Sequence, residues 1–522
     1  MNWLDYLIIV IYSAGLLSLG FFFKNQKDKT DFFLGGRSFG WFAMGMSTMA
    51  SQLSAISFIS AAAFVGMKTN GSMQWLTFEL AVPLAMIFLI VVLIPPLYKA
   101  GIVSIYAYLE KRFDASTRTL ISSVFQFSRA FATGIMIYTV ALVLSAVMGI
   151  PEWQTILVSG LITIIYSFQG GMKAVVWGDV IQMSILVIGI VICTLYGLKL
   201  LGGWDAFLAA ADTSRTRVID FNWGIGEGAD FGFWPMIIGG FFLYASYYGC
   251  DQSQAQRSLS GKSLKETQRA LLFNGLFRFP VTLCYCLMGL ILGTFAMTNP
   301  EFMGMIPTDK PDQMVPIFIL NYLPNGIIGL LLVAILAAAM SSLSSAINSL
   351  SAATLEDLIG RFRKEPLSDD QQLSYSKWLT LLWGAVCIIL AFSAGQIADT
   401  VIEAINKVGS AFYGPILATF LLAILSKKAH ARAVNIGLLA GVGLNMYIWL
   451  AGIPIFWIWW NFIGTAVTLF VGYGLSLIIP PKGEIKALLE TPQLKFARLE
   501  NYILLAFFGF MVWFSLSLPG WL

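Results

Sequence analysis

The sequence predicts an all-α integral membrane protein with about fourteen transmembrane helices, ten of which form two inverted repeats. The first observation is composition, because 58% of the 522 residues are hydrophobic and only 11% are charged. A soluble protein of this length could not bury so much apolar surface in cores of ordinary size. The second observation is that apolar runs long enough to cross a bilayer recur along the whole chain. The third is that the second and seventh runs are interrupted by polar and small residues.

The expected helices are apolar runs bounded by polar or charged segments. The expected ranges are 4–23, 40–66, 75–97, 119–147, 153–169, 176–200, 233–250, 268–296, 326–358, 377–397, 400–425, 432–452, 455–479 and 500–520.

The first helix, 4–23, is interpreted as a retained membrane span and not as a cleaved signal peptide. No basic region precedes it, and it is long enough to cross the bilayer. The basic cluster Lys24, Lys27 and Lys29 follows it. This arrangement favours an N-terminus on the outer side of the membrane.

Two spans carry interruptions at corresponding places in the chain. Range 40–66 contains small and polar residues among apolar neighbours, namely Gly45, Ser47, Thr48, Ser51, Gln52, Ser54 and Ser57. Range 233–250 runs directly into the polar segment CDQSQ. Irregular backbone at membrane depth is tolerated where it lines a cavity or is covered by protein, and paired interruptions are typical of transporters built from inverted repeats.

We interpret the chain as a single membrane domain over 1–522. Within it, each of the two breaks lies in the first helix of one repeat. The first repeat is expected at 40–200 and the second at 233–425. An extra N-terminal helix and loop would occupy 1–39, and peripheral helices would occupy 432–522.

Basic residues are concentrated in the loops after odd-numbered helices. Examples are KNQKDK, EKRFDASTR, RSLSGKSLKETQR, GRFRKE, SKKAHAR and PPKGEIK. Loops after even-numbered helices are poor in lysine and arginine for their length. Because basic loops remain in the cytoplasm, we expect a multi-pass protein of the cell membrane (inner or plasma membrane) with both termini outside.

A serine-rich stretch, AAAMSSLSSAINSLS at 337–351, lies within an otherwise apolar span. Ser341 and Ser345 are one helical turn apart, as are Ser344 and Asn348, so several oxygens share one sector of the helix. Neutral hydroxyl oxygens suit an alkali cation better than calcium or zinc. The alternative is that these serines bond to their own backbone or allow close helix packing.

Charged residues at membrane depth form a second group of candidates. Asp179 needs a partner to compensate its desolvation, and a bound cation could provide it. The alternative is an interfacial carboxylate that reaches the headgroups or pairs with Lys173. Glu79, Arg129 and Arg278 also lie in apolar sequence, where they could contact a solute or pair with other charges.

Other chemistry has weak support. His430, the only histidine, falls in a basic loop, and the five cysteines form no CxxC pair. The segment SGKS at 260–263 lacks the upstream glycine of a phosphate-binding loop. No basic patch has the aromatic interleaving of a nucleic-acid reader. We expect neither an enzyme nor a nucleic-acid partner.

Four segments in order resemble the sodium:solute symporter family. They are DFFLGGRSFGWFAMGMSTMASQLSAISFIS, GGMKAVVWGDVIQ, CDQSQAQRSLSGKS and AAAMSSLSSAINSLSAATLEDL. The resemblance extends over about residues 1–480 and implies a LeuT-type fold of two five-helix inverted repeats, with sodium as the coupling ion.

The resemblance implies a main sodium site and a second one. The main site would use backbone oxygens of Ala50, Leu53 and Ala338 with the hydroxyls of Ser341 and Ser342. Some relatives, such as sialic acid symporters, have a second sodium site. The matching positions here are Asp179, Ser344 and Ser345.

The resemblance also implies a solute pocket. Glu79 matches a sugar-binding glutamate and Tyr247 a tyrosine that closes the inner side of the site, while Arg278 and Asn406 replace a pocket lysine and glutamine. The chain departs from the sugar pattern where Ser57 replaces a glutamine and Ala132 an asparagine. Arg129, one turn from Ala132, could instead receive a carboxylate.

The predicted function is sodium-driven uptake of a small polar solute by alternating access, with a sugar or polyol favoured. The alternatives are an organic anion (sialic acid, a monocarboxylate or a vitamin) or proton coupling on the same fold. Composition alone also leaves a channel or a sensor without transport open. The expected partners are sodium, the solute and the lipid bilayer, and the expected functional unit is a monomer.

Overall fold

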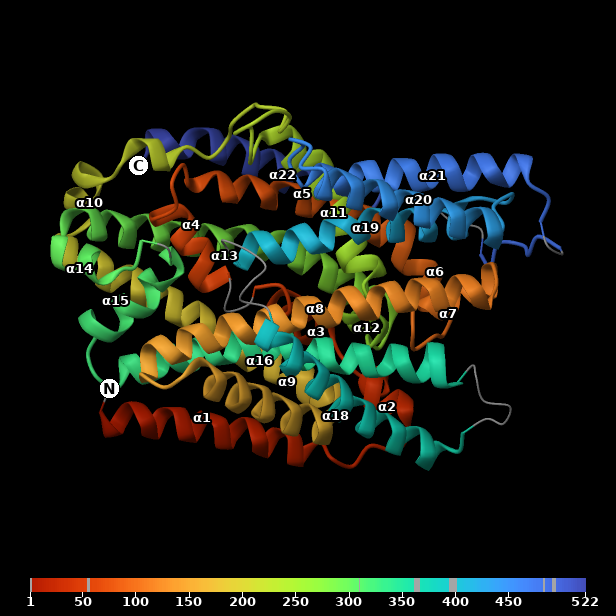
Figure 1. The fold of residues 1–522 in the computed structure, drawn as a ribbon, viewed down its shortest axis with the longest axis horizontal. Helices are drawn as coiled ribbons and strands as arrows, with labels where there is room; N and C mark the ends of the chain where they lie inside the picture. Colours follow the sequence, from red (N-terminus) through yellow and green to blue (C-terminus); the bar gives the residue numbers. More distant parts are fainter. Residues whose placement is uncertain are drawn as a thin grey trace.

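The computed structural model describes the backbone of residues 2–53, 57–308, 310–360, 367–393, 401–481, 484–490 and 494–522. Within these ranges, it describes all side chains except those of 16–17, 142–143, 146–148, 163, 166–170, 337–339, 341, 393 and 401–405. Helices that run along one long axis make up nearly all of the described chain (Figure 1).

The long helices lie in the ranges that the hydrophobic pattern predicts, except that α9 joins two predicted ranges. They are α1 (Trp3–Phe22), α8 (Ala115–Met148), α9 (Glu152–Leu201), α13 (Leu264–Thr298), α16 (Ile327–Ala353), α18 (Asp369–Ser393), α19 (Val401–Leu425), α20 (Ala431–Leu450), α21 (Trp459–Ile478) and α22 (Leu499–Ser517). The predicted 75–97 span is built from η3 (Met73–Leu80), α5 (Ala81–Phe88), η4 (Leu89–Leu93) and α6 (Ile94–Lys99).

Short helices connect these long ones. They are α2 (Lys29–Leu34), η1 (Gly35–Arg37), α7 (Tyr106–Arg112), α10 (Trp204–Ala210), η5 (Thr213–Thr216), α14 (Pro300–Met305), η6 (Pro311–Gln313), α15 (Met314–Tyr322), η7 (Thr354–Ile359), which continues α16, and η9 (Leu518–Gly520). The hydrophobic pattern does not predict them separately, because they are too short to show a period.

Ten helices in the described part of the chain are long and apolar enough to cross a membrane. Two further segments, Ser57–Gly66 and Ile327–Leu336, are apolar but shorter. The chain is thus a multi-pass membrane protein, whereas fourteen crossings remain a prediction. Figure 1 shows both termini at the same end of the bundle.

The predicted interruption in 40–66 is present. Helix α3 (Trp41–Ala50) ends at a turn over residues 51–53, and helix resumes at η2 (Ser57–Ala61) and α4 (Ala62–Gly66). In the turn, the N–H groups of Gln52 and Leu53 both bond to the Met49 carbonyl oxygen, at 3.0 and 2.8 Å. The regular ladder therefore stops in the middle of the protein, where carbonyl groups at the helix end lose their intrahelical partners.

The predicted 233–250 span is also followed by a break. Helix α11 (Phe233–Cys250) ends at Asp251, whose backbone is extended, and α12 (Gln252–Leu259) begins directly afterwards. Ser253 donates its backbone N–H to Asp251 Oδ1 at 2.8 Å, so the carboxylate caps α12. Every residue of the polar helix α12 is buried. Figure 1 places α3 and α12 in the middle of the bundle.

The predicted spans 153–169 and 176–200 form the single helix α9, with a kink in place of the expected loop. The kink lies at Gly171, which has φ of 52° and ψ of −153°. A Cβ atom there would lie 2.7 Å from the Phe32 carbonyl oxygen. Only glycine combines this backbone angle with such a close approach.

Glycines also bring α13 against α4. A Cβ atom on Gly289 would lie 2.4 Å from the Ala62 carbonyl oxygen, and one on Gly293 would lie 2.5 Å from that of Gly66. Small residues at such spacing let membrane helices approach closely, so that dispersion contacts hold them together. The half-helix after the first break is thereby fixed against α13.

A buried carboxylate ties α1 to the start of α16. Asp5 Oδ1 accepts hydrogen bonds from the backbone N–H groups of Gly326, at 2.7 Å, and Gly329, at 2.9 Å. The first N–H groups of a helix lack intrahelical partners and attract negative charge. Asp5 therefore caps α16 from a distant part of the chain.

Candidate functional site

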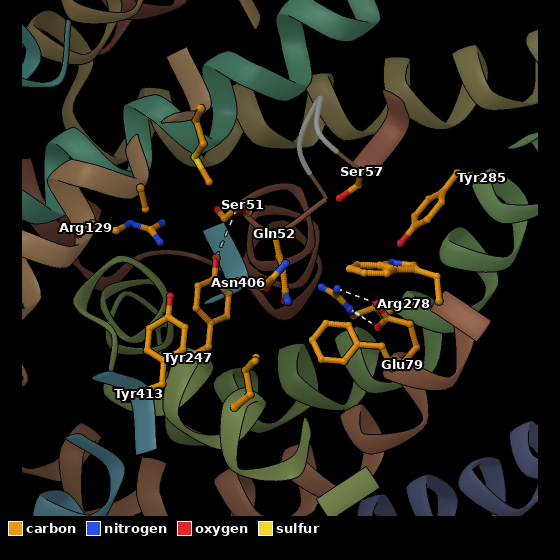
Figure 2. A pocket seen from close by; sticks show the side chains of 15 residues that line it. Ser51, Gln52, Ser57, Glu79, Arg129, Tyr247, Arg278, Tyr285, Asn406 and Tyr413 are labelled. Carbon is orange, nitrogen blue, oxygen red and sulfur yellow. Dashed lines mark hydrogen bonds and ion pairs between the residues drawn. The ribbon is translucent and has the colours of Figure 1, made fainter. Parts of the chain in front are cut away.

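All six residues predicted to bind the solute line one cavity between the two broken helices (Figure 2). They are Ser57, Glu79, Arg129, Tyr247, Arg278 and Asn406. Ser51 and Gln52, from the turn after α3, also line it. The fold thus brings together residues from six separate parts of the chain, while their role in binding remains a prediction.

Glu79 and Arg278 form a buried ion pair on one side of the cavity. Arg278 donates from Nε to Glu79 Oε2 and from Nη2 to Oε1, the latter at 2.9 Å. Tyr244 donates its hydroxyl to Glu79 Oε1 at 3.3 Å, and Arg278 Nη1 donates to the Tyr248 hydroxyl at 2.9 Å. The two charges offset each other, and both carboxylate oxygens already accept hydrogen bonds.

Arg129 reaches the cavity from α8, on the side away from this pair (Figure 2). Its side chain is 4% exposed, and its Nη1 atom lies 3.7 Å from Asp251 Oδ2. Its guanidinium also lies over the Tyr247 ring, 5.9 Å from the centroid. Within the described part of the chain, Arg129 Nε and Nη2 have no hydrogen-bond partner. A buried guanidinium with unused donors is suited to an acceptor group on a ligand.

Tyr247 forms one wall of the cavity. Its hydroxyl donates to the Ser51 carbonyl oxygen at 3.5 Å and accepts from Gln254 Nε2 at 3.0 Å. Its ring meets that of Tyr413 edge to face, with centroids 5.8 Å apart. Tyr247 thus bridges α11 and the turn that ends α3.

The predicted main sodium ligands lie at this same turn where the structure describes them. Ser342, on α16, donates its hydroxyl to the Ser51 carbonyl oxygen at 3.2 Å. Ala50, Leu53 and Ser342 are all buried. The side chains of Ala338 and Ser341 lie outside the described residues. A buried hydroxyl that meets the end of a broken helix fits an alkali ion, which prefers neutral oxygen ligands.

Of the second predicted set, Asp179 and Ser345 meet at a single buried cation, the guanidinium of Arg257. Arg257 Nη2 donates to Asp179 Oδ2 at 2.8 Å and to Ser345 Oγ. Ser344 is buried nearby on α16. Neither alternative interpretation of Asp179 is correct, because this carboxylate is 0% exposed and Lys173 pairs with Asp31 at 2.6 Å.

Comparison with known proteins identifies the family. The model of the sodium:solute symporter family matches residues 32–441. The chain belongs to the sodium:solute symporter family. It is a sodium-coupled transporter and not an enzyme.

Two human relatives of this symporter were found among curated proteins. The sodium/iodide cotransporter of Homo sapiens is 30% identical over 451 residues, covering 84% of this chain and 68% of the relative. Sodium-coupled monocarboxylate transporter 2 of Homo sapiens is 29% identical over 452 residues, covering 85% of this chain and 72% of the relative.

Solved structures confirm the LeuT-type fold of the symporter. The substrate-bound, outward-open structure of a Na⁺-coupled sialic acid symporter, described as revealing a novel Na⁺ site, matches with a TM-score of 0.83 and 26% identity. The match covers 92% of this chain and 99% of that one. A transporter of the nucleobase-cation-symport-1 family matches in fold alone, with a TM-score of 0.53 and 13% identity over 91% of this chain and 97% of that one.

Sequence reasoning missed several residues of the symporter's centre. Arg257 is the first residue of RSLSGKSLKETQR, which the basic pattern predicts as a loop, yet it lies on α12 and is 1% exposed. Gln52 accepts a hydrogen bond from the Tyr248 hydroxyl, and Tyr413 lines the cavity. The signal for Arg257 was its place in the motif CDQSQAQRSLSGKS, directly after an apolar span with no turn residue between.

Proposed function

We propose that the symporter couples inward sodium flow to uptake of a small organic anion, whose carboxylate binds to Arg129. The observation that carries this proposal is a guanidinium inside the cavity, 4% exposed, with Nε and Nη2 unpartnered in the described part of the chain. Guanidinium and carboxylate groups form short, charge-assisted and often bidentate hydrogen bonds. Burial strengthens such a contact, because water does not compete for it.

The unused Nε and Nη2 donors of Arg129, whose only ion pair is the long one with Asp251 at 3.7 Å in the described part of the chain, favour an anion over the sugar or polyol that the sequence favoured. Arg278 and Glu79 offset each other, and the Glu79 oxygens accept from Arg278 and Tyr244. Three donors already occupy this carboxylate, which leaves it little capacity for the several hydroxyls of a sugar. The two human relatives and the sialic acid symporter are named for iodide, monocarboxylate and sialic acid, which are anions.

For sodium, we propose a main site formed by backbone oxygens of Ala50, Leu53 and Ala338 and the hydroxyls of Ser341 and Ser342. The hydrogen bond of Ser342 to Ser51 supports it, since Ser51 also lines the cavity and accepts from Tyr247. An ion held at this turn would stabilise the wall of the solute cavity. Sodium and solute would then each favour the same conformation, which is the physical basis of coupling.

We propose that Asp179, Ser344 and Ser345, the predicted second sodium set, balance one buried positive charge, and Arg257 Nη2 donates to two members of this set. An intramembrane carboxylate needs a positive partner, and the hydroxyls of the two serines lie on the same helix.

We further propose that transport proceeds by alternating access in a monomer embedded in the cell membrane, with both termini on the outer side.

The proposed function is tested by uptake into proteoliposomes containing the purified protein. The labelled panel is acetate, lactate, pyruvate, iodide, sialic acid, glucose and inositol, each measured with a sodium gradient and with choline in place of sodium. We expect sodium-dependent uptake of a carboxylate. Uptake of glucose or inositol without competition by any carboxylate would contradict the proposal. Equal uptake when a proton gradient replaces the sodium gradient, with choline in place of sodium, would also contradict it.

Substitution of Arg129 tests its role directly. Arg129→Gln should lower uptake of the carboxylate at least tenfold at low solute concentration, because a charge-assisted contact contributes about 1.5–3 kcal/mol. Arg129→Lys should retain part of the uptake, since it keeps the charge but loses the paired donors. The control is Arg217→Gln, which removes an exposed arginine outside the cavity. Equal uptake in Arg129→Gln and wild type would exclude Arg129 as the anion site.

A further inference from the structure

Arg257 joins three helices around one buried carboxylate. It lies on α12 and is 1% exposed, while Asp179 lies on α9 and is 0% exposed. The guanidinium donates from Nη2 to Asp179 Oδ2 and Ser345 Oγ, and from Nε to Ser47 Oγ, the last at 2.7 Å. Ser47, near the end of α3, donates its own hydroxyl to Asp179 Oδ2. The cluster is therefore an anion with one fixed cation and two hydroxyls.

Arg257 contacts two of the oxygens in the predicted second sodium site, Asp179 Oδ2 and Ser345 Oγ. A metal ion and an N–H donor both need oxygen lone pairs, so they compete at these two atoms. The balance of charge also disfavours a sodium ion beside Arg257. A single carboxylate balances a single positive charge, and a second buried cation beside it would remain uncompensated.

Arg257 cannot leave this position without losing its partners. Its Nη1 atom donates to the Ser253 carbonyl oxygen on its own helix, which orients the side chain toward α9. All of α12 is buried, so withdrawal would leave the charge inside the protein.

We propose that Arg257 is a built-in cation that takes the place of a second sodium ion at Asp179, Ser344 and Ser345. The symporter then carries one sodium ion per cycle, bound at the main site. This inference rests on the proposed function, since it sets the ion count of that transport cycle. The role of Asp179 becomes to hold α9 against α12 and α3 through Arg257.

Sodium binding to the purified full-length protein tests the proposal without any knowledge of the solute. Equilibrium binding of ²²Na⁺ should saturate at one ion per wild-type chain. Arg257→Gln should expose the Asp179 carboxylate and raise this to two ions per chain. The double variant Asp179→Asn with Arg257→Gln removes both charges and should return to one ion. Arg269→Gln, which removes a surface arginine paired with Glu266, is the matched control and should bind one ion.

Two results would overturn the proposal. One is two ions bound per wild-type chain, and the other is one ion per chain in Arg257→Gln. Because Arg257→Gln removes the positive partner of a buried carboxylate and could prevent folding, the double variant and wild type provide a separate test through stability. The midpoint of thermal unfolding should rise with the logarithm of sodium concentration at equal slopes in both proteins. A steeper slope in wild type would show that the Asp179 site binds sodium despite Arg257.

These results also separate the inference from the proposed function. Wild-type protein that binds no ²²Na⁺ would contradict sodium coupling itself. Two ions per chain, together with sodium-dependent uptake of a carboxylate, would leave the proposed function intact and contradict only the role of Arg257.

Discussion

Ser342 and Ser349 are both buried on α16, yet their hydroxyls bond to different parts of the protein. Ser342 reaches across to the Ser51 carbonyl oxygen on the broken helix, whereas Ser349 bonds to the Ala346 carbonyl oxygen of its own helix at 2.8 Å. The own-backbone interpretation of the serine cluster therefore holds for Ser349, whereas the ion-site interpretation stays a prediction for Ser342. Hydrophobicity alone could not separate them, because the difference depends on which helix lies opposite each hydroxyl.

Ser342→Ala should raise the sodium concentration needed for half-maximal uptake by about fivefold or more. The reason is that loss of one hydroxyl ligand costs about 1 kcal/mol, which corresponds to that factor in affinity. The measurement is initial uptake against external sodium in proteoliposomes. Ser349→Ala is the matched control and should leave this concentration unchanged. An identical sodium dependence in both variants would remove Ser342 from the main sodium site.

The buried charges show the limit of prediction at this scale. Sequence reasoning established that Asp179 needs a partner, because desolvation of an unpaired carboxylate is costly. It did not find Arg257, which is 78 residues away along the chain. The pairing depends on the break at Asp251, which turns the chain back into the protein and buries the segment that the basic pattern had assigned to a loop.

Both helix breaks were predictable, because polar residues inside an apolar run have few stable alternatives at membrane depth. At the second break, Asp251 has two contacts that substitution can separate. Its Oδ1 atom caps α12 by accepting from Ser253, and its Oδ2 atom faces Arg129 at 3.7 Å. The kink at Gly171 was less visible, since one glycine pair between two apolar runs is also typical of a loop.

Asp251→Ala should unfold at a lower temperature than Asp251→Asn. Asparagine keeps a side-chain oxygen for the cap, whereas alanine loses it at a cost of about 1 kcal/mol. Both variants lose the charge that faces Arg129, so the comparison isolates the cap. Intrinsic tryptophan fluorescence during heating of the purified protein provides the measurement. Equal destabilisation would instead assign the effect to the lost charge.

For the whole molecule, the ion count and the charge of the solute together determine how transport responds to voltage. A single sodium ion with a monocarboxylate carries no net charge. A tenfold sodium gradient then supplies about 1.4 kcal/mol, enough for about tenfold accumulation. With two sodium ions the complex would carry one positive charge, and a potential of 100 mV would add about 2.3 kcal/mol.

We therefore expect uptake of a monocarboxylate to be insensitive to membrane potential. In proteoliposomes with a potassium gradient, valinomycin should leave the accumulation ratio at a fixed sodium gradient unchanged. An increase of tens of fold on making the interior negative would indicate a second sodium ion. As a control, parallel proteoliposomes contain a known electrogenic symporter of a neutral solute. Valinomycin should raise accumulation of that solute, which confirms that the potential is established.

The overall architecture was more accessible to prediction than the site. Long apolar helices and the four family segments identify the fold, because the lipid environment constrains which structures can cross it. The resemblance to the sodium:solute symporter family predicts which side chains line the cavity. It does not predict the hydrogen bonds and ion pairs that these side chains form with one another. Glu79 and Arg278 illustrate this, since only the packing of η3 against α13 shows that they pair with each other.

The contact between Asp5 and the start of α16 has a consequence for movement. One carboxylate oxygen accepts from two N–H groups of the first turn, those of Gly326 and Gly329, so this end of α16 cannot rotate about its axis without breaking both bonds. Beyond that end, α16 packs along its length against α9, α8, α1 and α18. Any tilt of α16 that keeps the contact with Asp5 would therefore displace Ser345 more than Ser342, because Ser345 lies farther from Asp5 along the helix.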